Sequence, residues 1–281
     1  MLCVVIPIQN EEERLGRVLD NVLALPVDLV LPVLNGSRDD SRRIVKSYPE
    51  DRIRLIHFEE PLGIDVPRAV GAFYAHRLGA DAVLFVDGDM VGEIRGTLEK
   101  LLQAVQGGVD LCLTNCYPTG SQSWPTSMVT QLLGVRKALT RALGLQHLGP
   151  ASPSHGPHAV SRRFLNAVPF RELAVPPVTL VLATQRRLRI GIAASLPHYE
   201  LGSPDRGPQH ARLIAETIVG DHLEAFCLLD NQKRSRSLLG ITFDGYHHTR
   251  RWDLLEQFMG SELSVPVKNY LVCRSATEEA P

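Results

Sequence analysis

The sequence predicts an α/β protein with a mostly parallel, doubly wound sheet flanked by helices and a helical C-terminal extension. Short apolar runs alternate with amphipathic segments over residues 1–115, and parallel strands require crossovers of that kind. The runs are continuous rather than alternating, as expected for strands that are buried on both faces. The run at 82–86 ends in Asp87, Gly88 and Asp89, at the end of the strand where such sheets form a crevice.

Six apolar runs are the expected strands of this sheet. They are short, rich in Val, Ile and Leu, and mostly bounded by Gly, Pro, Asn or Asp, which is typical of buried strands. In chain order they cover residues 2–8, 28–34, 53–58, 82–86, 110–114 and 190–194.

Helices are expected where apolar residues recur every three or four positions. Asn10 is the expected N-cap of the first helix, because Glu13 three residues later completes a capping box. Pro67 suits the first turn of the third helix. The other helices are expected up to Pro49 and over residues 94–105, 128–143, 178–189 and 209–228.

The composition fits one large globular domain. The formal net charge is −1, so no global positive field favours a nucleic-acid partner. No apolar stretch approaches the ~18 residues needed to span a bilayer, and Met1 leads directly into the first strand. The five cysteines are scattered without metal-ligand spacing, which predicts reduced thiols and a cytoplasmic protein.

Five segments carry a resemblance to a known family. They are residues 4–12 (VVIPIQNEE), 35–41 (NGSRDDS), 61–71 (PLG, then RAVG), 87–89 (DGD) and the segment from Gly156 to Arg163. In this order and spacing they resemble glycosyltransferase family 2 and its relatives with the GT-A fold. The long-range pattern is most similar to the branch of glucosyl-phosphoglycerate and mannosylglycerate synthases.

The resemblance implies one GT-A domain that uses a nucleoside diphosphate sugar. Residues 1–115 would form the nucleotide-sugar-binding half, 116–230 the acceptor-side half of the same domain, and 231–281 a basic C-terminal segment with a tail. The implied activity is metal-dependent transfer of a hexosyl group to an unidentified acceptor. The chain could act as a homodimer.

The implied site lies at the carboxyl ends of the first strands. Asp87 and Asp89 would bind Mg²⁺ or Mn²⁺, hard cations that prefer oxygen donors, with His198 or His222 as a further ligand. The residues implied in nucleotide-sugar binding are Pro7, Asn10, Glu11, Asn35, Ser37, Arg68 and Asp87. Alternative roles are helix caps for Asn10 and Ser37 and an exposed helix cation for Arg68.

One departure from the family pattern concerns the catalytic base. Inverting members carry an acidic pair before the helix expected from residue 178, whereas this chain has Pro176 and Pro177. Asp221 or Glu224 could deprotonate the acceptor instead, or a retaining enzyme could act without a base. The third alternative is a non-catalytic nucleotide-sugar-binding protein that has lost its base.

A basic stretch near the C-terminus suggests a lid. Its cations alternate with Phe243, Tyr246 and Trp252, which predicts that the segment packs against the protein. We expect an anion-binding lid over the Asp87 crevice, which would suit an anionic acceptor; the alternative is a solvated face. The residues concerned are Lys233, Arg234, Arg236, Arg250 and Arg251, with His247 and His248 nearby.

Overall fold

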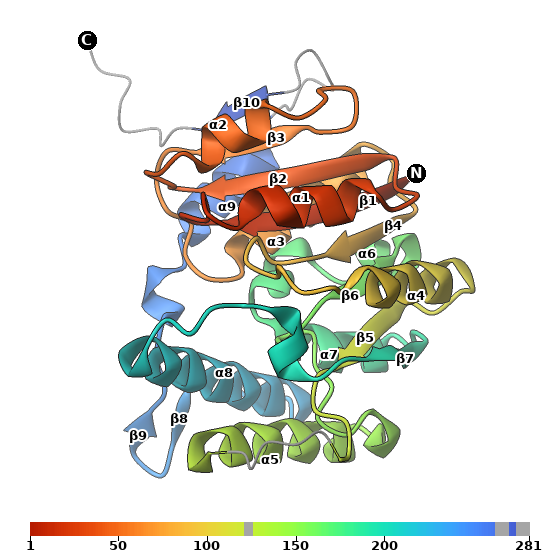
Figure 1. Ribbon diagram of the computed structural model, residues 1–281. Coiled ribbons are helices and arrows are strands. Elements are labelled where there is room, and N and C mark those ends of the chain that lie inside the picture. Colours follow the sequence, from red (N-terminus) through yellow and green to blue (C-terminus); the bar gives the residue numbers. More distant parts are fainter. Residues whose placement is uncertain (121–125, 262–269, 274–281) are drawn as a thin grey trace.

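The computed structural model describes residues 1–120, 126–261 and 270–273, and its centre is one eight-stranded sheet (Figure 1). Its strands are β1 (Leu2–Ile8), β2 (Leu29–Asn35), β3 (Leu55–Phe58), β4 (Ala82–Phe85), β5 (Leu111–Asn115), β6 (His158–Ser161), β7 (Ile190–Ser195) and β10 (Tyr270–Cys273). A separate two-stranded hairpin consists of β8 (Ser237–Leu238) and β9 (Ile241–Thr242).

Helices connect and cover these strands. They are α1 (Leu15–Leu23), α2 (Ser41–Lys46), α3 (Val66–Arg77), α4 (Arg95–Gln106), α5 (Ser127–Ala142), α6 (Arg162–Ala167), α7 (Pro176–Gln185), α8 (Pro208–Leu229) and α9 (Trp252–Gly260). Short 3₁₀ helices lie at Gln146–Leu148, Phe170–Ala174, His198–Leu201 and His247–Thr249. All six expected strands and the expected helices are present, with Pro67 in the first turn of α3.

The strand order is β10-β3-β2-β1-β4-β6-β5-β7. Every neighbouring pair is parallel except those that involve β6, which runs antiparallel to β4 and to β5. The predicted fold class, an α/β protein with a mostly parallel sheet, is therefore confirmed. The antiparallel direction of β6 and the edge strand β10 were not predicted, because runs as short as these four residues are ambiguous from the apolar pattern alone.

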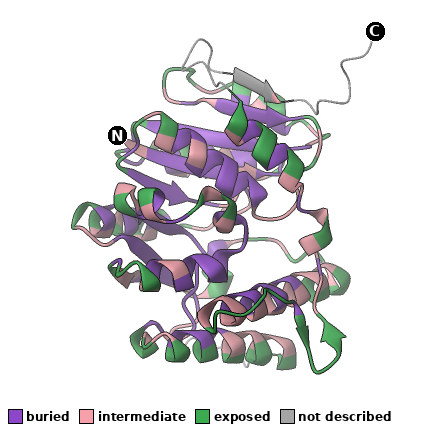
Figure 2. Cartoon of the chain, turned by 180° about the vertical axis from the view of Figure 1, so that it is seen from behind, coloured by how far each residue is buried: buried purple, intermediate pink, exposed green. Residues whose placement is uncertain are grey.

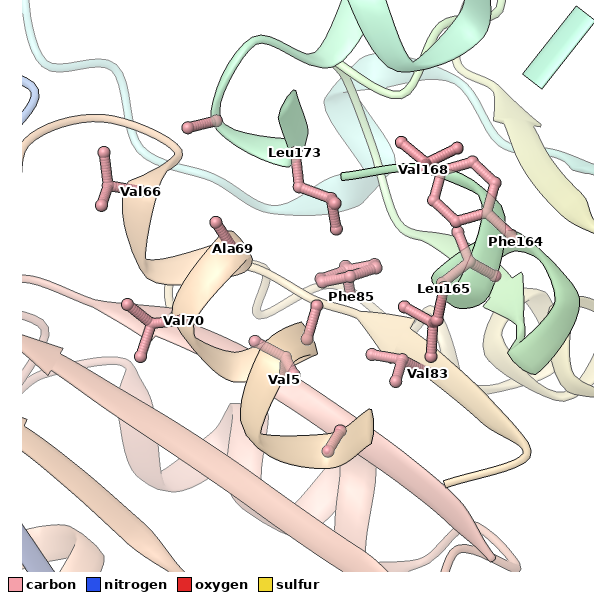
Figure 3. Packing of buried hydrophobic residues seen from close by; sticks show 14 of the residues in the cluster. Val5, Val66, Ala69, Val70, Val83, Phe85, Phe164, Leu165, Val168 and Leu173 are labelled. Carbon is pink, nitrogen blue, oxygen red and sulfur yellow. The ribbon is translucent and has the colours of Figure 1, made fainter. Parts of the chain in front are cut away.

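Hydrophobic residues cover both faces of the sheet. One cluster packs α3, α6, α7 and α9 against one face, and the other packs α1, α2 and α4 against the opposite face. Figure 3 shows the first cluster, in which Val5 of β1 and Phe85 of β4 lie beneath α3 and α6. Because α3 passes close to β1, a Cβ atom at Gly71 would lie 2.3 Å from Val5.

The predicted caps of the first two helices are wrong. The N-cap of α1 is Arg14, and Asn10 lies in a left-handed turn (φ 56°) with its Oδ1 accepting a hydrogen bond from the Arg38 backbone at 2.8 Å. Asp40 rather than Ser37 precedes α2. The Ser37 hydroxyl instead accepts from the Asn10 N–H at 3.1 Å, so these two residues hold adjacent loops together.

The C-terminal half extends beyond the sheet, as predicted. Helix α8 packs against α7 and α5, and the exposed β8–β9 hairpin lies beyond it (Figures 1 and 2). The chain then returns to the sheet through α9, which packs against α3. The expected tail after residue 273 lies outside the described residues. No helix in the described part of the chain is long and apolar enough to cross a membrane.

Candidate functional site

A cavity of about 790 Å³ lies at the carboxyl ends of β1, β2 and β4. The loop before α3 and residues of α8 complete its walls. It is lined by six residues that the sequence predicted for the site, together with Asp221: Pro7, Glu11, Asn35, Arg68, Asp87 and Asp89. Polar side chains from strands far apart in the sequence therefore meet at one place.

Asp87 and Asp89 follow β4, where the backbone of Gly88 lies close to the end of β1. The Gly88 N–H donates to the Pro7 carbonyl at 3.1 Å, and a Cβ atom at Gly88 would lie 2.9 Å from that oxygen. Glycine is therefore required between the two carboxylates. Asp87 accepts a hydrogen bond from Arg68 at 2.6 Å.

Arg68 is a buried member of the site rather than an exposed helix cation. Its guanidinium pairs with Asp87 and also with Asp65 at the start of α3. Asp65 has a left-handed backbone (φ 60°), which is uncommon outside glycine and places its carboxylate beside Arg68. Burial raises the pKa of Asp65, although Arg68 and Arg250 lower it.

The loop before α8 supplies two partners for Asp89. Ser203 donates to one of its oxygens at 3.1 Å, and Arg206 donates to the other at 3.3 Å. Arg206 also forms a hydrogen bond with Glu11. The sequence analysis missed Ser203 and Arg206, because the glycines and prolines of residues 202–208 mark a turn but do not link it to Asp89.

The carboxylates of Asp87, Asp89 and Glu11 suit a divalent cation. Glu11 is buried, and its Oε2 atom has no hydrogen-bond partner, with Arg14 at 3.5 Å. Burial raises the pKa of Glu11, although Arg206 lowers it and Asp89 raises it further. All three residues line the cavity, Arg206 links Glu11 to Asp89, and their carboxylates are the kind of oxygen ligand that Mg²⁺ and Mn²⁺ prefer.

Neither histidine considered as a metal ligand lines this cavity. The Nδ1 atom of His198 lies 3.1 Å from the Nε2 atom of His155. His222 is buried in α8, and its Nδ1 atom lies 2.7 Å from the Ile218 carbonyl oxygen. Burial lowers the pKa of His222 to about 4. The geometry therefore gives no support to a histidine ligand beside Asp87 and Asp89.

Asp221 and Glu224 are tied to arginines of the C-terminal segment. Asp221 accepts hydrogen bonds from Arg236 at 2.6 Å and from Arg250 at 2.7 and 2.8 Å, while Glu224 accepts from Arg236 at 2.7 Å. Glu224, Asp221 and His247 come within 4.8 Å of one another, but guanidinium groups already occupy the carboxylate oxygens. Each carboxylate is therefore held in an ion pair with an arginine of the C-terminal segment.

The basic C-terminal segment packs as predicted, but its arginines do not form a free anion-binding surface. Arg236 and Arg250 are buried, and the side chain of Arg250 is 0% exposed. Arg234 pairs with Glu172, and Arg251 pairs with Glu60 and Asp253. Most of these carboxylates come from other parts of the chain, so the expected cationic lid is corrected to a wall whose arginines are paired with carboxylates.

That wall still borders the cavity. Tyr246, Thr249 and Arg251 line it, and the loop at Gly63 lies against the Thr249 backbone. At this glycine, φ is +83° and an added Cβ atom would lie 2.2 Å from the Thr249 oxygen. Asn35 holds the same loop, because its amide donates to the Gly63 carbonyl at 3.3 Å and accepts from the Leu62 N–H.

Comparison with known proteins identifies the family. The sequence model described as "Glycosyl transferase family 2" matches residues 3–165, and no curated protein matches the chain. The fold is similar to glucosyl-3-phosphoglycerate synthase from Mycobacterium tuberculosis in complex with Mg²⁺ and UDP. That pair has a TM-score of 0.60 and 19% identity, over 84% of this chain and 81% of that chain.

Two further solved structures have the same fold. The synthase in complex with Mn²⁺, UDP-glucose and phosphoglyceric acid has a TM-score of 0.59 at 19% identity, over 84% of this chain and 81% of that chain. A mycobacterial protein has a TM-score of 0.59 at 19% identity, over 80% of this chain and 74% of that chain. Because the family match spans more than half of its length, the chain belongs to glycosyltransferase family 2 and is a glycosyltransferase with the GT-A fold.

Proposed function

We propose that the protein transfers a sugar from a nucleoside diphosphate sugar in a reaction that depends on Mg²⁺ or Mn²⁺. The observation that carries this proposal is the convergence of Asp87, Asp89 and Glu11 in one cavity, with Arg68 and Arg206 beside them. The similar synthase structures hold Mg²⁺ with UDP or Mn²⁺ with UDP-glucose, which supports the same use of this site.

The donor would lie along the ends of β1 and β2. Pro7, Asn35 and the loop at Gly63 line that side of the cavity, while Asn10 and Ser37 support the loops from behind. The bond between the anomeric carbon and the β-phosphate oxygen breaks, and that oxygen keeps the electron pair. A bond forms from the anomeric carbon to an acceptor hydroxyl, whose proton passes to the leaving diphosphate or to water.

The charged residues have separate roles in this proposal. Asp87 and Asp89 would hold the cation, with Glu11 as a further oxygen donor, and the cation would stabilise negative charge on the leaving diphosphate. Arg68 and Arg206 now neutralise these carboxylates. Guanidinium groups bind phosphate strongly, so both arginines would turn to the diphosphate when a cation takes their place.

No general base is assigned to Asp221 or Glu224, because Arg236 and Arg250 engage their oxygens. Pro176 and Pro177 begin α7 where inverting members carry an acidic pair. Their side chains have no ionisable group, so they provide no alternative base. Base-independent transfer and binding without catalysis remain the two hypotheses. The cytoplasmic location and the homodimer stay predictions of the sequence.

The test compares Asp89→Asn with Glu93→Gln, which removes an exposed carboxylate on the same loop. Calorimetric titration with UDP and GDP, with and without Mn²⁺, should show that Mn²⁺ increases the affinity of the wild type and of Glu93→Gln. Asp89→Asn should lose at least a tenfold Mn²⁺-dependent gain, worth about 1.4 kcal/mol, without a change in Tm.

Unchanged Mn²⁺ dependence in Asp89→Asn would reject the metal site. A panel of UDP- and GDP-sugars then tests turnover. Hydrolysis or transfer with any donor supports the enzyme, whereas metal-dependent binding of every donor without reaction favours the non-catalytic alternative.

A further inference from the structure

One face of α8 forms a wall of the cavity that contains Asp87 and Asp89. The residues of this helix that line the cavity recur at helical spacing, so they share one face. They are His210, Ile214, Thr217, Ile218 and Asp221. Figure 1 shows α8 apart from β1 and β2, so a cavity lined by residues of the helix and of both strand ends spans the space between them.

The polar residues of this helix face already have partners within the protein. The Nδ1 atom of His210 lies 2.9 Å from the Tyr246 hydroxyl. The Thr217 hydroxyl donates to a backbone carbonyl of its own helix at 2.8 Å and accepts from the Tyr246 N–H at 2.7 Å. Asp221 is paired with two arginines of the C-terminal segment. The surface that this face offers to a ligand therefore consists mainly of the two isoleucines.

Ile214 and Ile218 do not pack into the protein core. Neither belongs to the two hydrophobic clusters that the described residues form, and both are partly exposed. They lie one helical turn apart, so their side chains are neighbours on the helix surface. Tyr246 adjoins them, because its N–H donates to the Thr217 hydroxyl on the same face and its side chain also lines the cavity. We call Ile214, Ile218 and Tyr246 the α8 patch.

Among the described residues, the three arginines that line the cavity are all paired with carboxylates. Arg251 is held by two of them at its rim. Arg68 and Arg206 pair with carboxylates of the proposed cation site, and in the proposed function both turn to the diphosphate of the donor. Within the described chain, the α8 side of the cavity therefore offers an anion no unpaired arginine, and its open surface suits an apolar group instead.

The donor leaves the α8 patch uncovered in the proposed arrangement. Its diphosphate and sugar are polar, and the carboxylates, arginines and loops that suit them lie at the carboxyl ends of β1, β2 and β4. Polar groups that lie against an apolar wall lose their hydrogen bonds to water, whereas a hydrocarbon group that covers the wall removes apolar surface from water. The second substrate is therefore the ligand whose chemistry matches the patch.

We propose that the α8 patch is an apolar subsite that binds an alkyl or aromatic group of the glycosyl acceptor. This inference rests on the proposed transfer and adds the chemical class of the second substrate. The acceptor hydroxyl would point toward Asp87 and Asp89, where the donor places its anomeric carbon, and the apolar group would cover Ile214 and Ile218. An acceptor of this class is an alcohol with a hydrocarbon portion.

Ligands with one head group and different hydrocarbon lengths test the subsite. Propane-1,2-diol and hexane-1,2-diol are each titrated calorimetrically into the protein with Mn²⁺ and whichever of UDP or GDP binds. The longer chain should increase affinity by about tenfold or more, since each buried CH₂ group contributes about fourfold. Glycerol 3-phosphate, which carries charge in place of hydrocarbon, should bind more weakly than hexane-1,2-diol. Equal affinity for the two diols, or tighter binding of the phosphate, would overturn the inference.

Two variants of α8 locate the site. The Ile214→Thr, Ile218→Thr double variant keeps β-branched side chains but adds hydroxyl groups to the wall, so the longer diol should lose most of its advantage. Val219→Thr makes the same kind of change at the next position of α8, which does not line the cavity, and should keep the advantage. An unchanged ratio of the two diol affinities in a folded double variant would place the hydrocarbon chain elsewhere and reject the subsite.

A milder pair of substitutions serves if the double variant does not fold. Ile214→Val with Ile218→Val removes one carbon from each side chain and keeps an apolar wall. This variant should bind hexane-1,2-diol about twofold or more weakly, because the chain loses contacts with the wall, and should bind propane-1,2-diol as the wild type does. Wild-type affinity for hexane-1,2-diol in this variant would count against the patch.

Failure of the proposed function has a different signature. Nucleotide affinity with Mn²⁺ should not differ among the wild type, Val219→Thr and the isoleucine double variant. A loss in the isoleucine variant alone would mean that the nucleobase covers the patch, which overturns the inference but not the donor site. If none of these proteins binds nucleotide, the donor site is wrong, and the diols are titrated without nucleotide. A chain-length advantage that only the isoleucine variant loses would then support the apolar subsite by itself, and equal diol affinities would reject it.

Discussion

Two regions of the molecule bury arginine in opposite ways. In the arginine–carboxylate network (Asp65, Asp221, Glu224, Arg236 and Arg250), every guanidinium has carboxylate partners within 3.5 Å. Arg136 of α5 is equally buried, but no described carboxylate pairs with it and its Nε atom has no hydrogen-bond partner. The first region cross-links the C-terminal segment to the domain, whereas the charge of Arg136 makes no such cross-link among the described residues.

The difference shows why counting cations along a sequence misjudged the C-terminal segment. Five cations between residues 233 and 251 suggested an anion-binding lid, but the carboxylates that neutralise the buried ones come from the loop at Asp65 and from α8. The sequence did not predict a buried Arg136, because a cation on an amphipathic helix is usually solvated. Whether a cation is free to bind an anion depends on the carboxylates near it in the fold, not on the number of cations near it in the sequence.

The largest expected effect comes from breaking the network. Arg250→Met leaves Asp221 and Asp65 buried with one guanidinium fewer, which should lower the free energy of unfolding by about 3–5 kcal/mol. Denaturation by urea measures this loss. The matched control is Arg212→Met on the surface of α8, whose ion pair with Glu216 is exposed, and it should cost less than about 1 kcal/mol.

A loss in Arg250→Met no larger than that of the Arg212→Met control would contradict the description of the network as a cross-link. The Asp221→Leu, Arg250→Met double variant then separates the two effects. If the damage comes from unpaired charge, removing both partners should cost less than the sum of the single losses.

Most of the fold could be read from the sequence, because buried parallel strands are continuous apolar runs. Strand β1 was predicted to the residue, and β7 and α8 within one residue at each end. The errors concern helix starts and caps, which depend on tertiary contacts. Asn10 has the sequence of an N-cap, yet its side chain binds the Arg38 backbone, and α1 begins only at Leu15.

The site could be predicted only in its first half. Asp87 and Asp89 follow a buried strand, so their position at the cavity was expected from topology. Ser203 and Arg206 lie more than one hundred residues later in a loop without a motif, and no local pattern links them to Asp89. Partners that depend on how two distant segments pack leave no signal in one sequence.

The second largest effect is a loss of folding stability in acid, which we expect from the buried His222 and its cationic neighbour Arg136. The pKa of His222 is about 4 when folded, below the ordinary 6.5, because burial disfavours the charged ring and Arg136 adds to that. Between pH 6.5 and 4 the unfolded chain binds more protons, so stability is present above that window and is lost as pH falls through it. The loss from pH 7 to pH 5 should be roughly 2 kcal/mol for this group.

Urea denaturation at pH 7 and pH 5 measures that loss. His222→Gln should remove about one proton from the pH dependence of unfolding. His158 remains in this variant with a pKa lowered to about 3, so some acid sensitivity persists. Identical pH profiles for His222→Gln and the wild type would show that His222 is not held neutral by burial.

The smallest effect is expected at Arg136 itself, and it is the sharpest test of the comparison. Arg136→Met keeps the stem that packs in α5 but removes a buried charge that no described carboxylate compensates. The free energy of unfolding measured without added anions should therefore stay the same or rise by up to about 1 kcal/mol, since replacing buried charge with a well-packed apolar group is often neutral or stabilising. A loss of about 3 kcal/mol, as expected for Arg250→Met, would mean that Arg136 is held by a structural partner. The two buried arginines would then be equivalent. A neutral result would show that the charge of Arg136, unlike that of Arg250, does not contribute to the stability of the fold.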